Sequence, residues 1–399
     1  MNVLTDVRRF LHVKDAGLLL SILIFYGIGT GILAPMNSIY LRDSIGLTKG
    51  QIVSVFSVSL LLNMGITIMA GAWSDKLAGK KKLALTAAVL CMTGLSLYMR
   101  ADNYLEALVG MCIAVAPSGL IMGQLFAMSR LHFQRHAPEI VEMAQIWLRA
   151  GYSVGFFLGL LAGANIYLLA NFQGVLWGNL AGYALLFGLL LFFKEYKEKA
   201  NPGETKAGEP FSLLMLFALL MLACADAIRG LYLPLVVKEL FGKPHYMSYL
   251  WSAQAVFELL FMTVAGYWAA RYGSKRVILL GALCALATYF VYSSSPSLAV
   301  FFIMQPVYSF FVSVLYGVAM GYVQRMFLSR SGFGASLYVF ISQTASLIGY
   351  LLPLFAEGYR QTIFLIPSSL VAGSLLLMTL VLMLDRKKDT QMAKHQGFR

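Results

Sequence analysis

Charged residues are scarce in this chain. Of its 399 residues only 12% are Asp, Glu, Lys or Arg, whereas 59% are hydrophobic. A soluble domain carries about 25% charged residues, so this chain has too few charges to cover a globule of its size with a wetted surface. We therefore expect lipid to surround most of the chain, and its length does not indicate two or three soluble domains.

Cysteine is rare as well. The four cysteines, at positions 91, 112, 224 and 284, lie inside apolar runs, with no Cys-x-x-Cys pair and no nearby histidine. We interpret them as small buried side chains rather than as a disulfide framework or a metal site. The sequence also has no nucleotide-binding P-loop and no catalytic triad, so it predicts neither direct use of ATP nor an enzyme, and no cofactor.

The net charge of +13 does not indicate a nucleic-acid partner. A nucleic-acid binder clusters basic residues and aromatics on one surface, whereas here the basic residues form short tracts between apolar runs. Arg8, Arg9 and Lys14 precede an apolar run from Ala16 to about Tyr40. This run is too long for the core of a removable signal peptide, so we expect an uncleaved first span.

Apolar stretches of about 20 residues are long enough to cross the hydrocarbon core as helices. The sequence predicts twelve such spans, which gives an all-α polytopic membrane protein. The polar stretch 195–210 predicts a cytoplasmic loop between six-helix halves at 1–194 and 211–399. The predicted spans are 16–40, 51–73, 83–99, 105–128, 140–166, 172–193, 211–237, 247–269, 277–294, 298–322, 335–356 and 362–384.

The distribution of lysine and arginine supports this arrangement. Of the 31 basic residues, 23 lie at the two ends of the chain or in the loops that follow even-numbered spans, and 6 lie in the opposite loops. The other two, Arg149 and Arg229, fall inside spans. Because cytoplasmic loops carry the excess of positive charge, we expect both termini in the cytoplasm.

Two loops, about 195 residues apart, repeat one pattern. Each places a glycine near a helix end, then a basic residue, a second glycine and a basic cluster. The first copy has Gly71, Asp75, Lys76, Gly79 and Lys80, and the second has Gly266, Ala270, Arg271, Gly273 and Lys275.

This pattern resembles the signature loop of the major facilitator superfamily, Gly-x3-Asp-Arg/Lys-x-Gly-Arg/Lys-Arg/Lys. The resemblance implies two parallel halves with a binding site near the middle of the bilayer. It also implies a conformational latch that comprises Gly71, Asp75, Gly79, Lys80, Arg271 and Gly273. The first copy has one extra residue before Gly79, and Ala270 replaces the acid in the second. The latch should therefore depend mainly on the first half.

Four ionisable residues lie within the predicted spans, where a charge costs roughly 3 kcal/mol or more and usually faces a cavity or a partner. Arg149 in span five and Glu258 in span eight fall near mid-depth, and these spans are neighbours in the superfamily, so we expect the two residues to share the central site. Asp226 and Arg229, three apart in span seven, share a helix face. They are either a self-neutralising pair or residues that line the cavity. Because burial favours the neutral form of a carboxyl, Glu258 and Asp226 are the candidates for proton coupling.

Uncharged polar residues within spans supply candidate substrate contacts. Amides bind hydroxyl groups, and an aromatic ring stacks on a sugar or a drug, so we assign substrate binding to Tyr26, Asn37, Arg149, Gln254 and Gln305. Each of these side chains could instead hold helices together. In span five, glycines recur every four residues and form a stripe that allows close helix packing. They are Gly151, Gly155, Gly159 and Gly163.

Short segments over most of the chain resemble the sugar efflux transporters of bacteria. They include Ala34-Pro35, Leu148-Arg149-Ala150, Leu233-Pro234-Leu235 and Phe257-Glu258-Leu259. The resemblance implies proton-coupled export of small sugars from a bacterial cell, with Arg149 and Glu258 as functional residues. A multidrug exporter, a proton-coupled nutrient importer and a non-transporting membrane protein remain as alternatives. The expected partners are a small-molecule substrate, protons and the inner-membrane bilayer, and we expect a monomer.

Overall fold

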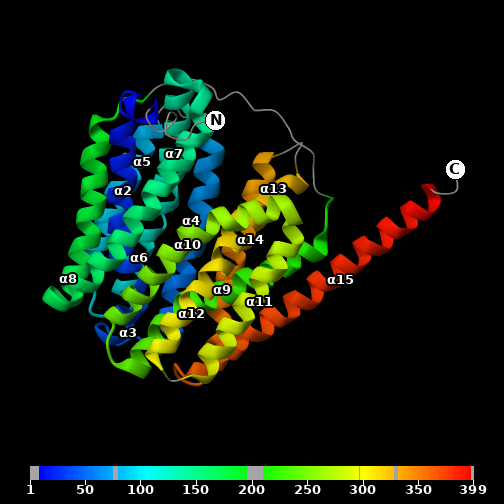
Figure 1. Cartoon of the computed structure of the whole chain (residues 1–399). Helices are drawn as coiled ribbons and strands as arrows, with labels where there is room; N and C mark the ends of the chain where they lie inside the picture. The colour runs from blue at the N-terminus through cyan, green and yellow to red at the C-terminus, as the bar shows by residue number, and fades with distance from the viewer. Residues whose placement is uncertain (1–8, 75–79, 196–209, 296, 328–330, 397–399) are drawn as a thin grey trace. The chain divides into compact units, whose positions relative to one another are not determined.

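The computed structural model describes residues 9–74, 80–195, 210–295, 297–327 and 331–396, and these form helices without β-strands. Their contacts define two compact units (Figure 1). The first comprises residues 1–202 together with 243–252, and the second comprises 203–242 with 253–399. The prediction of an all-α polytopic fold is confirmed.

The first unit contains the helices of the predicted first six spans (Figure 1). They are α2 (Ala16–Leu33), η1 (Ala34–Met36), α3 (Asn37–Asp43), α4 (Lys49–Ser74), α5 (Lys80–Tyr98), α6 (Tyr104–Val115), α7 (Ser118–His136), η2 (Pro138–Ile140) and α8 (Val141–Phe192).

The helices of the last six spans follow, and the start of α10 groups with the first unit. They are α9 (Leu213–Phe241), α10 (His245–Tyr272), α11 (Ser274–Ser294), α12 (Leu298–Ser313), the π-helical turn η3 (Val314–Ala319), α13 (Met320–Met326), α14 (Ser331–Leu351), η5 (Leu352–Phe355), η6 (Gln361–Phe364) and α15 (Leu365–Gln396).

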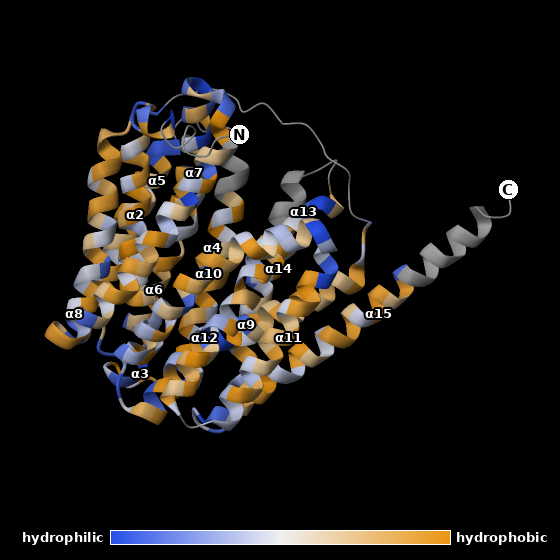
Figure 2. Cartoon of the chain, viewed as in Figure 1, coloured by the Kyte–Doolittle hydropathy of each residue, from blue (hydrophilic) through white to orange (hydrophobic). Residues whose placement is uncertain are grey.

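Ten stretches of described helix are long and apolar enough to cross a membrane. One of them, 143–192, contains two predicted spans, because α8 kinks at Ala170 and Asn171, where the backbone leaves helical geometry. Helix α5, which begins with three lysines, corresponds to the remaining predicted span. Hydrophobic residues run along the helices, and hydrophilic ones gather near helix ends (Figure 2).

Prolines interrupt two spans that the sequence predicts as continuous. A proline inside a helix lacks an N–H donor and clashes with the carbonyl of the preceding turn. In span one, Pro35 lies in η1 between α2 and α3, and in span four Pro117 separates α6 from α7. At the second break, the side-chain N–H groups of Asn63 in α4 donate to the carbonyls of Val115 (2.9 Å) and Ala116 (3.2 Å) at the end of α6.

The glycine stripe of span five packs against α2. An added Cβ on Gly155 would lie 2.1 Å from the carbonyl oxygen of Ile24, and one on Gly159 would lie 2.2 Å from that of Ile28. These separations are far below van der Waals contact, so the two backbones approach as closely as the absence of side chains permits. This packing fixes the positions of spans one and five relative to each other within the first unit.

Candidate functional site

A buried polar cluster joins α9, α11 and α12 in the second unit. Arg229 of α9 is only 3% exposed, and its guanidinium carbon lies 3.8 Å from the centroid of the Tyr308 ring. An Arg229 N–H donates to the side-chain oxygen of Gln305 (3.1 Å), and the amide N–H of Gln305 donates to the Tyr292 hydroxyl (2.7 Å). A ring face and an amide therefore take the place of water around this charge.

Asp226 lies one turn before Arg229 and completes the cluster. The Tyr308 hydroxyl donates a hydrogen bond to one oxygen of this carboxylate, and the Tyr316 hydroxyl donates one to the other oxygen at 2.6 Å. The ion pairs among the described residues do not include Asp226 with Arg229. Tyr308 instead contacts both, with its hydroxyl on the acid and its ring on the base. We call Asp226, Arg229, Tyr292, Gln305, Tyr308 and Tyr316 the Asp226–Arg229 cluster.

The sequence singled out none of the tyrosines of this cluster, and among them Tyr316 differs from Tyr308 in its exposure. Tyr316 lies in the π-helical turn η3 and is 37% exposed, whereas Tyr308 is fully buried. Asp226 itself is half-buried. Asp226 is therefore more exposed than Arg229, which lies one turn later on the same helix.

Helix α10 brings Glu258 to the same region. The Ser309 hydroxyl donates to the main-chain carbonyl of Gln254 (2.9 Å), and Ser313, one turn later, donates to that of Glu258 (3.1 Å). Small serines spaced by four let α10 approach α12 closely. The Glu258 side chain is half-buried, and its main-chain carbonyl lies against Ser313, one turn before Tyr316. Of the two predicted proton-coupling carboxylates, Asp226 binds the Tyr316 hydroxyl and Glu258 lies on the adjacent α10.

Two of the predicted substrate contacts in the first unit are packed between helices. Tyr26 is 5% exposed, and its ring centroid lies 5.6 Å from that of Tyr152. Asn37 accepts the hydroxyl proton of Tyr98 (2.7 Å) and donates to the sulfur of Met111 (3.7 Å). Each side chain has a partner within its own unit, and its role in substrate binding stays a prediction.

The remaining predicted substrate contacts differ in exposure. Arg149 is exposed on α8 in the first unit, and Glu258 belongs to the second, so their pairing stays a prediction. Gln254 is half-buried. Gln305 is fully buried, and its amide N–H also donates to the Phe301 carbonyl (2.7 Å). In this structure the Gln305 side chain therefore accepts a hydrogen bond from Arg229 and donates one to a main-chain carbonyl of its own helix.

In the first half, Asp75 and Gly79 of the predicted latch lie outside the described residues, and Gly71 lies in α4. The main-chain N–H groups of Lys80 and Lys81 donate to the carboxylate of Glu195, at 2.7 and 3.2 Å. An acid at this helix N-terminus complements the unpaired N–H groups of the first turn. The Lys81 ammonium also donates to the carbonyls of Leu191 and Phe193, at 2.8 and 2.7 Å.

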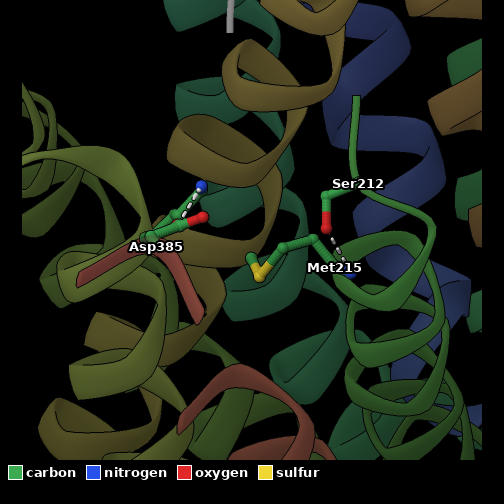
Figure 3. A network of polar contacts seen from close by, with 4 residues as sticks. Ser212, Met215 and Asp385 are labelled. Atoms are coloured by element: carbon green, nitrogen blue, oxygen red, sulfur yellow. Dashed lines mark hydrogen bonds and ion pairs between the residues drawn. The ribbon is translucent and has the colours of Figure 1, made fainter. Parts of the chain in front are cut away.

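The second half joins the equivalent helices by an ion pair. The Lys275 ammonium at the start of α11 lies 2.7 Å from the carboxylate of Asp385 in α15. Figure 3 shows Asp385 and, at the start of the neighbouring α9, the Ser212 hydroxyl that accepts the Met215 N–H. Gly273 of the predicted latch has a φ of +90°, a conformation that favours glycine.

The two contacts occupy equivalent places in the repeat. Lys81 and Lys275 are 194 residues apart, and so are Leu191 and Asp385. In each half, a lysine at the start of the third helix therefore binds the end of the sixth. The first half uses main-chain oxygens of Leu191 and Phe193, and the second uses the carboxylate of Asp385.

Solved structures with the same fold include the nucleoside transporter NupG, with a TM-score of 0.74, 13% identity, and coverage of 92% of this chain and 98% of that one. A POT family transporter in complex with 5-aminolevulinic acid has a TM-score of 0.77 and 13% identity, and the match covers 94% of this chain and 97% of that one. At these identities the likeness shows the fold alone.

Sequence relatives cover most of the chain. "Sugar efflux transporter A" of Escherichia coli is 22% identical over 346 residues, which are 84% of this chain and 87% of the relative. A "Putative sugar efflux transporter" of Deinococcus radiodurans is 24% identical over 377 residues, 90% of this chain and 96% of the relative. The sequence profile of one family matches residues 19–224 and 215–397, and the chain therefore belongs to the Major Facilitator Superfamily.

Proposed function

We propose that this protein exports small sugars or sugar-like compounds across the inner membrane of a bacterium in exchange for protons. The observation that carries the proposal is the half-buried carboxylate of Asp226, which two tyrosine hydroxyls bind, with Glu258 on the adjacent α10 within the same unit. Relatives named as sugar efflux transporters support the substrate class.

Proton exchange follows from the cost of charge in a dry site. A carboxyl that opens to water releases its proton, and one that is closed off from water retains it, because desolvation disfavours the charged form. An arginine that approaches the carboxylate favours release, and we assign this role to Arg229 through Tyr308 and to Arg149. Loss of the proton would then accompany a change in which side of the membrane the site faces.

Alternating access would rock two six-helix halves, residues 1–194 and 211–399, about the substrate site. Tyr26, Asn37, Gln254 and Gln305 would contribute substrate contacts as the packing around them rearranges. The latch of Gly71, Asp75, Gly79, Lys80, Arg271 and Gly273 would stabilise one of the two end states. Both chain termini would lie in the cytoplasm.

The substitution Glu258→Gln tests this function. The amide has nearly the shape of the acid but cannot carry an exchangeable charge, so we expect at least a tenfold loss of uphill transport. Counterflow, which needs no net proton movement, should be retained. Transport is measured in proteoliposomes with an imposed pH gradient, over a panel of radiolabelled sugars and cationic dyes.

Glu357→Gln, at an exposed position in the loop before η6, is the matched control and should leave transport unchanged. Uphill sugar transport by Glu258→Gln at the wild-type rate would refute the coupling role of Glu258. Efflux of dyes without any sugar by the wild-type protein would refute the proposed substrate class.

A further inference from the structure

Tyr316 combines accessibility with a fixed orientation. The π-helical turn Val314–Ala319 carries it, and single π-turns within α-helices occur frequently at functional sites. Its hydroxyl donates to Asp226 at 2.6 Å, and a hydrogen bond to a carboxylate is among the strong ones in proteins. The ring is thus held in place while 37% of the residue stays exposed.

The surroundings of Tyr316 indicate that its exposed side faces a polar path rather than lipid. Asp226 accepts a hydrogen bond from its hydroxyl, and the main-chain carbonyl of Glu258 accepts one from Ser313, one turn before Tyr316. A carboxylate that faced hydrocarbon would be costly, and such groups almost always face a bundle interior or a water-filled space. The serines at 309 and 313, on the preceding turns, hold α10 close to α12 on this side.

An exposed ring beside the carboxylate of Asp226, with Glu258 on the adjacent helix, matches the chemistry of a pyranose. A neutral pyranose has a C–H face that packs on an aromatic ring and a rim of hydroxyl groups that donate to carboxylate oxygens. A rigid aromatic side chain supplies contact area at little cost in side-chain entropy. Asp226 retains lone pairs beyond those that the two tyrosines use, because a carboxylate offers about four acceptor sites.

We propose that Tyr316 is a substrate-binding residue whose ring is the platform for a sugar ring, with Asp226 and Glu258 accepting hydrogen bonds from the sugar hydroxyl groups. The assignment rests on the proposed function and adds to it a residue and the uncharged pyranosides as the ligand class. It separates two roles within one side chain, since the ring binds substrate and the hydroxyl fixes the ring.

Substitutions that keep or remove the ring test the platform. With radiolabelled methyl β-glucopyranoside in proteoliposomes, Tyr316→Leu should raise KM at least tenfold, whereas Tyr316→Phe, which keeps the ring, should change KM less than threefold. Tyr267→Leu is the control, because Tyr267 lies on α10 and is 63% exposed. An unchanged KM in Tyr316→Leu, or an equal rise in the Leu and Phe variants, would overturn the proposal.

A labelling experiment gives an answer that does not depend on transport. Tyr316→Cys is made in a background in which the four free cysteines at 91, 112, 224 and 284 are replaced by serine. We expect a hydrophilic thiol reagent to label the new thiol. Because the variant lacks the ring and should bind the sugar more weakly, methyl β-glucopyranoside is added well above the KM of the Tyr316→Leu variant, and at that concentration it should slow the labelling at least threefold. No labelling would place position 316 in lipid and overturn the inference, as would labelling that the sugar does not slow.

The two experiments separate this inference from the proposed function. If the sugar binds at position 316 but is transported without protons, labelling of the Tyr316→Cys variant is slowed while the pH gradient has no effect on flux through the wild-type protein. The platform then stands and proton coupling fails. If uphill sugar flux is normal in Tyr316→Leu, the exporter stands and the platform fails.

Discussion

At the scale of single residues, Tyr308 determines how the charges of Asp226 and Arg229 meet. Its hydroxyl binds the acid and its ring covers the base, so each charge has a partner within the bundle. The negative charge of Asp226 and the positive charge of Arg229 thus offset each other, although the two side chains form no direct ion pair. Removal of either charge leaves the other in a region that water solvates poorly.

This dependence predicts non-additive effects on stability. Asp226→Asn should lower the free energy of unfolding by on the order of 2 kcal/mol, below the roughly 3–5 kcal/mol for a fully buried pair because Asp226 is half-buried. The double variant Asp226→Asn/Arg229→Met removes both charges and should recover part of that loss.

Thermal melting of the purified protein in detergent, for both single variants and the double variant, measures the coupling. Losses that simply add would show that the two charges act independently. The same measurements at two salt concentrations should agree closely, because Arg229 is buried and salt screens buried charges little.

The sequence located the chemical groups of this region but not the way they combine. Asp226, Arg229, Glu258 and Gln305 stand out because charges and amides are rare in apolar runs. Tyr316 does not, since the chain has 21 tyrosines and a tyrosine in a span is ordinary packing material. Only the tertiary contact with Asp226 and the π-turn distinguish it, and neither has a local signature in the sequence.

At the scale of helices, glycine spacing was more informative than hydropathy. The four-residue spacing in span five predicted a flat stripe, and the stripe meets the carbonyl groups of α2. Hydropathy gave the spans but missed the interruptions at Pro117 and at Val314–Ala319, because helix breaks leave an apolar run equally apolar. The break between spans five and six was predicted at 167–171, and α8 kinks there, at Ala170 and Asn171.

Two alanine substitutions on α8 test the glycine packing. At Gly155 the new Cβ would lie 2.1 Å from the Ile24 oxygen, so helices must separate, and we expect a destabilisation of about 1–3 kcal/mol. At Gly188 a Cβ would meet nothing within 4 Å, and alanine should be neutral or slightly stabilising because of its helix propensity. Melting temperatures in one detergent compare the two, and equal values would contradict the packing argument.

At the scale of the whole molecule, the duplication is visible in contacts as well as in sequence. Lys81 and Lys275 bind the ends of the sixth and twelfth spans at positions with the same 194-residue offset. The loop pattern predicted the basic residues of both copies. It did not predict their partners, because Leu191 contributes a main-chain oxygen and Asp385 a side chain, and the two share no residue type.

The ion pair of the second half should contribute little to folding. The side chains of Lys275 and Asp385 are 16% and 41% exposed, and pairs of this kind contribute about 0.2–1 kcal/mol. A double-mutant cycle with Lys275→Met and Asp385→Asn should give a coupling in that range that decreases at high salt. A coupling energy above about 2 kcal/mol would contradict this prediction, because it exceeds what an ion pair of this exposure contributes.

The π-turn in span ten also sets the rotational orientation of α13, the helix that follows it. One additional residue in a turn shifts the following helix by about 100° relative to an uninterrupted α-helix, which advances 3.6 residues per turn. In this phase an N–H of Arg325 in α13 reaches the Ser274 hydroxyl at the start of α11, at 2.6 Å. Deletion of one residue between 314 and 319 would rotate α13 and turn Arg325 away from Ser274, even though both residues would still be present.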